Sequence, residues 1–363
     1  MTLRRDLRPP ALVLSLVLAA VVWSSPATRA QNAIDVVWVN GPIYMFVGAG
    51  GNVTASVGED GVLLVDSGSE AMSGALLDAI RGLQRRLGET ARPAPRGGGA
   101  EGRSSVVQNR STPAPPKPVR YIINTSAAAE HTGGNQRIGA SGVTFTGGNV
   151  AGQLRDAGVG AAVYAHEQVL QRMARKTPEL PFAMLPTNTY YQPSLKLSHF
   201  FNGEGIRMVH MPAARSDGDT IVHFTRSDVI ATGDIFSQTG YPMIDLEAGG
   251  SIDGVLDALN DILDLAIPEF RTEGGTMIVP GHGRLSDSAD VGYYRDMLTI
   301  VRDNVRTMID RGMTLSQVKS ARPTKAYDGR FGADRGPWTT DMFVEAVYRS
   351  LAGEAAGPGR ATP

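Results

Sequence analysis

The sequence contains no cysteine and only 6 histidines among its 363 residues. The absence of cysteine excludes disulfide bonds, thiolate metal ligands and a cysteine nucleophile. Any metal site must therefore be built from histidine imidazoles and from aspartate or glutamate carboxylates. Because histidines are few, each one that lies in a polar, glycine-rich loop is a candidate ligand.

An excess of charge of either sign is also missing. The chain has 35 Lys and Arg residues against 36 Asp and Glu residues, which gives a formal charge of -1. No overall field attracts nucleic acid or an anionic membrane, so we expect no nucleic-acid partner. The expected partner is a small molecule, and the oligomeric state is left open. Apolar residues make up 42% of the chain, enough for the core of one large domain with extensions.

Long hydrophobic runs are scarce. The run at residues 11–23 follows three arginines and precedes small residues that end at Ala30. It is shorter than the roughly 20 residues that a membrane-spanning helix needs. This pattern predicts a signal peptide over residues 1–30, cleaved near Ala30, and a periplasmic or secreted protein without a stable membrane span.

The rest of the chain alternates between two hydrophobic periods. Short segments rich in β-branched residues predict a meander of strands at 36–39, 43–47, 53–57 and 62–65, followed by a helix through Leu76, Ile80 and Leu83. Further strands are expected at 119–123, 143–145, 206–211, 220–224, 229–231 and 277–279. Helices are expected at 165–174, 252–263, 294–308 and 340–351. Such interleaving indicates an α/β fold.

The composition changes sharply at two places. Residues 91–118 are Pro, Gly, Arg and Ser with almost nothing to bury, which predicts a disordered insertion. The helical patterns gather after residue 285. We therefore expect a domain over 31–285 that contains this insertion, a helical C-terminal extension over 286–351 and a disordered tail over 352–363.

Three polar, glycine-rich loops follow apolar strands, at residues 124–135, at 214–219 together with 231–234, and at 280–283. Loops held by a rigid sheet are where catalytic side chains concentrate. Their candidate ligands for zinc or a similar divalent ion are Glu130, His131, Asp234 and His282. Each has an alternative structural role: the histidines can pack under glycine turns, and Asp234 can accept backbone hydrogen bonds.

The order of these loops and their amino-acid sequences resemble those of the metallo-β-lactamase superfamily over residues 34–285. In that family a strand ending in Asn-Thr leads into His-x-His-x-Asp-His-x-Gly-Gly-Asn, where this chain reads NTSAAAEHTGGN from Asn124. The VDSG turn ending at Gly68, the ARSDGDT loop, the Gly-Asp turn at Asp234 and the PGHG segment around His282 continue the match. The resemblance implies a four-layer αββα sandwich with the site along one edge.

The departures from the family pattern concern one of its two metal sites. The three histidines of the first site are replaced here by Ser126, Ala128 and Arg215, so we expect that site to be absent. The second site keeps a full set of ligand types, with Glu130 in place of aspartate, together with His131, Asp234 and His282. Asp66 is expected to orient a ligand or to form a turn.

Two functions remain open. In the first, the protein is a divergent hydrolase in which one divalent metal, zinc by the resemblance, activates water against an ester, thioester, amide or similar bond, with Glu130 or Asp234 as general base. In the second, the protein holds no metal and is catalytically inactive. Arg215 then pairs with Glu130 or Asp234 in the vacated site, and the pocket binds an anionic ligand or a protein partner.

Overall fold

The computed structural model describes residues 33–48, 50–90, 116–144, 160–267 and 275–353. From Ile34 onward the described chain belongs to one compact unit. The predicted signal peptide lies outside the described residues, as do nearly all of the predicted insertion and most of the predicted tail. None of the described helices is long and apolar enough to cross a membrane.

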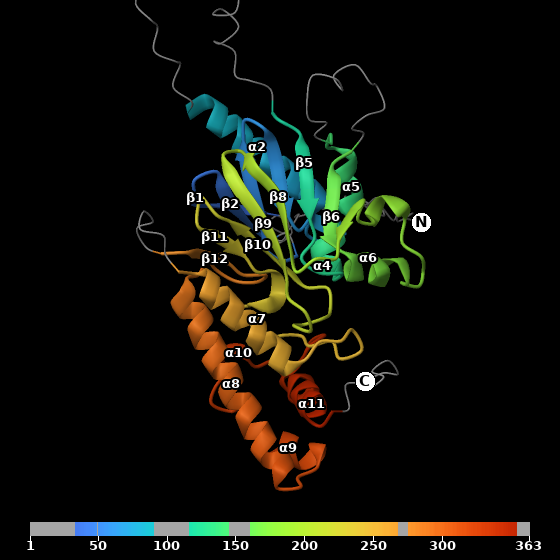
Figure 1. Ribbon diagram of the computed structural model, residues 1–363, viewed down its shortest axis with the longest axis vertical. Coiled ribbons are helices and arrows are strands. Elements are labelled where there is room, and N and C mark those ends of the chain that lie inside the picture. Colours follow the sequence, from blue (N-terminus) through green and yellow to red (C-terminus); the bar gives the residue numbers. More distant parts are fainter. Residues whose placement is uncertain (1–32, 49, 91–115, 145–159, 268–274, 354–363) are drawn as a thin grey trace, which may run out of the picture. The chain divides into compact units, whose positions relative to one another are not determined.

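The first sheet has seven strands in chain order (Figure 1). They are β1 (Asp35–Asn40), β2 (Ile43–Val47), β3 (Val53–Gly58), β4 (Gly61–Val65), β5 (Val119–Ile123), β6 (Ala162–His166) and β7 (Asn188–Tyr190). The first four form an antiparallel meander, which confirms the sequence prediction. Strands β4 to β7 run parallel. The carboxyl ends of β4 and β5 therefore meet at the same edge.

The second sheet has five strands in the order β12-β11-β10-β9-β8. They are β8 (Ser194–Phe201), β9 (Glu204–His210), β10 (Thr220–Phe224), β11 (Val229–Ala231) and β12 (Met277–Val279). Only β11 and β12 pair in parallel. At the β12 edge, the backbone N–H and C=O of Ile278 bond to Ser286 at 2.8 and 2.9 Å.

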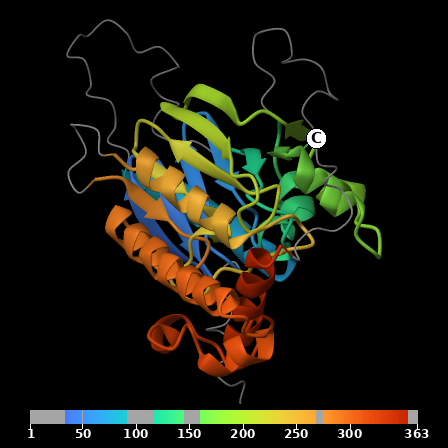
Figure 2. The same ribbon diagram turned by 60° about the horizontal axis from the view of Figure 1, so that its bottom comes forward.

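Three buried clusters define four layers. Residues such as Met45 and Ile123 of the first sheet pack against Met208 and Val222 of the second, which places a core between the sheets. Helix α2 (Ser73–Thr90) covers the outer face of the first sheet. Helices α7 (Ile252–Leu265) and α8 (Ser288–Asp310) cover the second (Figure 2). The arrangement is the αββα sandwich that the sequence predicted.

Shorter elements connect and extend these layers. They are η1 (Glu70–Met72), α4 (Ala129–Thr132), α5 (Asn135–Ala140), α6 (Glu167–Ala174), η3 (Phe182–Met184), η4 (Gly233–Ile235), α9 (Leu315–Ala321), α10 (Asp328–Phe331) and α11 (Thr340–Leu351). The last helix has the predicted bounds. Its buried face, which includes Phe343 and Val347, joins the cluster formed by α7, α8 and the second sheet.

Two sequence predictions of local structure differ from the structure in their extent. The helix expected at 165–174 begins only at Glu167, because Ala165 and His166 end strand β6 and the His166 side chain caps the helix. The strand expected at 143–145 is reduced to one bridge between Val143 and Gly160, and residue 145 lies outside the described residues. Both segments are short, so their periodicity could not separate a strand from a helix.

Candidate metal site

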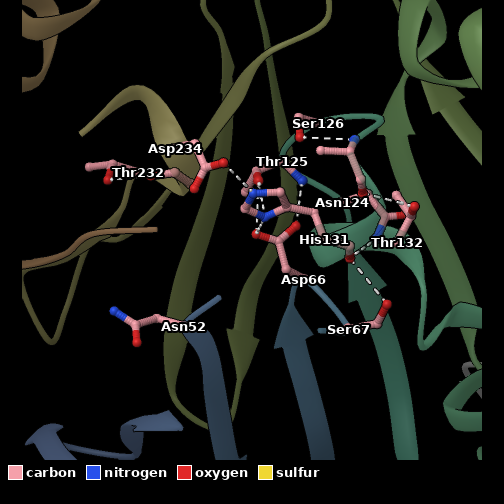
Figure 3. A network of polar contacts seen from close by, with 12 residues as sticks. Asn52, Asp66, Ser67, Asn124, Thr125, Ser126, His131, Thr132, Thr232 and Asp234 are labelled. Atoms are coloured by element: carbon pink, nitrogen blue, oxygen red, sulfur yellow. Dashed lines mark hydrogen bonds and ion pairs between the residues drawn. The ribbon is translucent and has the colours of Figure 1, made fainter. Parts of the chain in front are cut away.

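The candidate site lies where four strands end. Asp66 follows β4, and the 124–135 loop follows β5. Asp234 follows β11, and His282 follows β12. Because each of these strand pairs is parallel, each sheet brings two loops to the same edge, and the packing of the sheets joins all four loops. Figure 3 shows the result, with His131 between Asp66 and Asp234.

His131 is fully buried between two carboxylates. Its Nδ1 lies 2.6 Å from Asp66 Oδ2, and its Nε2 lies 3.0 Å from Asp234 Oδ2. Burial disfavours a charge on the ring, but the two carboxylates prevail and raise the pKa of His131 well above its ordinary value. The contact of Nε2 with Asp234 is an ion pair, and this nitrogen has no hydrogen-bond partner among the other described residues.

Asp66 holds His131 in place. Its Oδ1 accepts a hydrogen bond from the Thr125 backbone N–H, and its Oδ2 accepts one from the Thr125 hydroxyl, both at 2.8 Å. Asp66 has a left-handed backbone, with φ of 67°, which is uncommon for a non-glycine residue. Because the carboxylate binds both Thr125 and the imidazole, it fixes the orientation of the ring and aims Nε2 toward Asp234.

Asp234 is the centre of the site. Its Oδ2 accepts a hydrogen bond from Arg215 Nη1 at 2.8 Å, and its Oδ1 lies 3.3 Å from His282 Nε2. Burial alone would raise the pKa of Asp234, but His131, Arg215 and His282 hold it well below its ordinary value. The carboxylate is therefore ionised. Its Oδ1 is buried and has no hydrogen-bond partner among the described residues.

A donor set suited to a metal forms around Asp234. One atom each from Glu130, Asp234 and His282 lies within 4.8 Å of the other two. Donors bound to one small divalent ion lie about 2.0–2.4 Å from it, so they are separated by at most about 5 Å. Two carboxylates and an imidazole, with an unpaired oxygen on Asp234, fit a divalent cation. His131 lies against Asp234 but outside this three-residue group.

The three positions where the family has histidine ligands are occupied here by Ser126, Ala128 and Arg215, and none of them supplies an imidazole. Ser126 is buried, and its Oγ accepts a hydrogen bond from the Ala128 N–H at 3.3 Å. The Arg215 side chain is 8% exposed and donates from Nε to the Met243 carbonyl at 3.0 Å as well as to Asp234. Of the two carboxylates expected as partners of Arg215 in a metal-free protein, Asp234 is the one that pairs with the guanidinium, and Glu130 is not.

Backbone contacts fix the loop that carries His282. The Asn52 side chain donates to the carbonyls of Pro280 and Gly283, both at 2.9 Å, and the Asn52 N–H donates to Gly281 at 2.7 Å. Sequence reasoning treated Asn52 only as part of the family match. The sequence places Asn52 after a turn between two strands. It could not show that Asn52 bonds to Pro280 and Gly283, which lie more than 200 residues further along the chain.

A cavity of about 360 Å³ opens at the site. Its charged lining residues are Glu130, Arg215, Asp234 and His282. Much of the remaining lining comes from residues that the sequence analysis did not single out, among them Tyr241, Phe331 and Trp338. Their hydrophobic spacing is that of ordinary core residues, so no signal in the sequence distinguished them.

Comparisons with known proteins agree with this architecture. No protein-family model and no curated protein matches the sequence. Among solved structures, an inverting sec-alkylsulfatase from Pseudomonas matches with a TM-score of 0.51 and 14% identity, over 87% of this chain and 50% of its own. A metallo-β-lactamase from Pontibacter korlensis matches with a TM-score of 0.47 and 12% identity, over 73% of this chain and 99% of its own.

The DIM-1 metallo-β-lactamase gives the same TM-score and identity as the Pontibacter protein, over 74% of this chain and 97% of its own. These identities are too low to carry an activity from one protein to another, and the likeness concerns the fold alone. The layers, the sheet order and the likeness to the alkylsulfatase agree: the chain has the metallo-β-lactamase fold.

Proposed function

We propose that the protein is a hydrolase that uses one divalent cation bound by Glu130, Asp234 and His282, with His131 beside them. The observation that carries the proposal is the convergence of these three donors within 4.8 Å at a cavity. Zinc is the expected cation, because mixed imidazole and carboxylate ligands suit it. The substrate contains an ester, thioester, amide or similar bond.

The balance of charge favours one cation rather than two. The site contains three carboxylates, from Asp66, Glu130 and Asp234, and one permanent positive charge, from Arg215. One divalent cation brings the sum of these charges, counted without the imidazoles, to zero. A second cation would lie close to the guanidinium, with only Ser126 as an additional oxygen donor, and would be repelled.

The side chains at the site have separable roles. When bound, a divalent cation lowers the pKa of a water molecule and polarises a substrate oxygen. Glu130 is partly exposed at the cavity and makes no hydrogen bond or ion pair with the described residues, so its carboxylate is free to take a proton from water. Arg215 keeps Asp234 ionised and adds positive charge where the substrate develops negative charge.

A second candidate function is supported by one contact. Arg215 and Asp234 form an ion pair of 2.8 Å in which the side chains are 8% and 9% exposed, and this pair needs no metal. In this alternative the protein is catalytically inactive and binds an anionic ligand or a protein partner through the same cavity. The two candidates differ in whether the purified protein takes up a metal.

The test is the metal content of the purified mature chain, measured by elemental mass spectrometry after exposure to zinc, manganese or iron. The hydrolase proposal requires about one ion per chain, lost in His282→Ala and reduced in His131→Ala. His210→Gln is the matched control, since His210 bonds to the Asp217 carbonyl and does not line the cavity. If the wild type holds no more metal than His282→Ala, the proposal fails and the metal-free candidate replaces it.

A further inference from the structure

The cavity at the candidate site is built from two chemically different parts. Its charged residues form one cluster, in which Glu130 and His282 both lie close to Asp234. The rest of its lining has no charged residue. This uncharged part comes from the 237–243 segment and from the C-terminal helical region, and it includes Tyr241, Met243 and Trp338. A ligand that fills the cavity therefore meets charged side chains at one end only.

The aromatic part of the lining is preformed. The Tyr241 ring stacks on Phe343 with centroids 4.5 Å apart, and it lies 6.0 Å from the Phe331 ring. Its hydroxyl bonds to Asp328 Oδ1 at 3.1 Å. Since Tyr241 is held at both ends, a ligand meets this wall without having to order it, which reduces the entropy cost of binding.

The hydroxyl groups that line the same part of the cavity already stabilise the local backbone. Thr340 Oγ1 accepts a hydrogen bond from Ala333 N–H at 2.9 Å, and Thr339 Oγ1 accepts one from Met342 N–H at 3.3 Å. Ser237 and Thr239 bond to each other at 3.2 Å. The oxygens of these hydroxyl groups already accept or share hydrogen bonds, and the buried Trp338 Nε1 is a donor without a partner among the described residues. The region therefore offers mainly apolar surface with one free donor, and a sugar or another strongly polar group would lose more hydrogen bonds to water than it regains there.

From this division we infer that the cavity binds a small molecule with a compact aryl or branched alkyl group against Tyr241, Phe331 and Trp338, and a metal-binding carbonyl or acyl group at Asp234. As a substrate class this rests on the proposed function, and it selects small esters or amides of apolar acids. A volume of about 360 Å³ admits a molecule of this kind but not a folded partner. Nucleotides are disfavoured, because Arg215 is the one permanently cationic side chain in the lining and Asp234 already pairs with it.

The test compares two neutral ligands that share a metal-binding head, phenylacetohydroxamic acid and acetohydroxamic acid. Binding to the full chain is measured by titration calorimetry with and without added zinc. We expect the phenyl ligand to bind about ten- to a hundredfold more tightly, as burial of an aromatic ring predicts. Met243→Ala and Trp338→Ala should each reduce that ratio at least about threefold.

Trp38→Ala is the matched control, because Trp38 is 61% exposed on β1 and does not line the cavity. Met243 is itself 37% exposed, so its truncation tests the wall without endangering the fold. Equal affinities for the two ligands, or an unchanged ratio in both cavity variants, would overturn the inference. A preference for the phenyl ligand, combined with affinities that added zinc leaves unchanged, supports the apolar wall and places the failure in the hydrolase proposal instead.

Discussion

Charge pairing at individual residues determines what this site can do. Asp234 contacts three cationic or potentially cationic side chains, and His131 contacts two carboxylates. The ligand types at Glu130, His131, Asp234 and His282 could be predicted from glycine-rich loops and from a family resemblance. The pairing of these side chains could not be predicted. Arg215 and Asp234 lie on two different loops, and only the folded structure shows that Arg215 contacts Asp234 rather than Glu130.

Replacing Arg215 with methionine tests the ion pair between Arg215 and Asp234. The change leaves the buried Asp234 carboxylate without its guanidinium, so we expect metal-free protein to lose about 3 kcal/mol of unfolding free energy. Zinc should restore part of the loss by supplying the missing charge. Urea denaturation with and without zinc measures both effects. Arg172→Met, which removes an ion pair with Asp217 that is about one third exposed, should cost less than about 1 kcal/mol. An equal loss in both variants would contradict this account.

A second histidine cluster lies apart from the cavity. The rings of His166 and His210 stack with centroids 3.7 Å apart and planes 5° apart. Burial and the neighbouring His210 lower the pKa of His166 to about 4. The ordinary value of about 6.5 applies to the unfolded chain. Between these two pH values the unfolded state binds the proton more readily than the folded state, so the free energy of unfolding decreases as the pH falls.

We therefore expect the stability of the protein to fall by roughly 2 kcal/mol between pH 6.5 and pH 4 through His166 alone. Chemical denaturation at several pH values measures this loss. His166→Phe keeps a ring to stack on His210 and should flatten the dependence in that window. An unchanged slope in the variant would show that another group is responsible.

Among the elements, the short loops after β11 and β12 pack closely against each other. Gly281 packs against the Gly233–Asp234 turn, and a Cβ at Gly281 would overlap Asp234 Oδ1 and lie 2.8 Å from the Gly233 carbonyl. Only glycine allows this approach. The sequence predicted β11 and β12 and identified both loops. It gave no sign that the two strands are neighbours, since 45 residues lie between Ala231 and Met277.

Gly281→Ala should therefore separate the two loops, destabilise the protein by about 2 kcal/mol and remove most of the metal binding. Gly292→Ala is the control within helix α8, where a Cβ would have no atom within 4 Å. That change should stabilise the protein by about 0.5–1 kcal/mol, because alanine favours a helix over glycine. Thermal unfolding together with metal analysis distinguishes the two. Full metal binding in Gly281→Ala would refute the close-packing argument.

At the scale of the whole molecule, the C-terminal helices are part of the core. Val301 of α8 and Phe343 of α11 belong to the same buried cluster as Ile230 of the second sheet and Leu259 of α7. Amphipathic spacing predicted these helices, with the bounds of α11 matched and the start of α8 placed six residues too late. It could not show where their apolar faces pack, because periodicity reports that a face is buried and not what covers it.

Truncation after Leu285 should therefore expose the apolar faces of α7 and the second sheet. We expect the shortened protein to lose its cooperative thermal transition and its near-ultraviolet circular dichroism signal. Truncation after Gly353 is the matched control and should leave the melting temperature unchanged, in line with the predicted tail. A cooperative transition in the shorter protein would mean that the first 285 residues form an independent domain.

The bond between Ile278 and Ser286 affects more than the shape of one loop. An open strand edge is a template on which a second molecule can add its own strand, which is how sheet proteins begin to aggregate. Here the backbone groups of Ile278 already bond to Ser286, four residues beyond His282. The segment that carries the candidate metal ligand His282 thus also occupies part of one sheet edge, and changes made there to alter chemistry put solubility at risk.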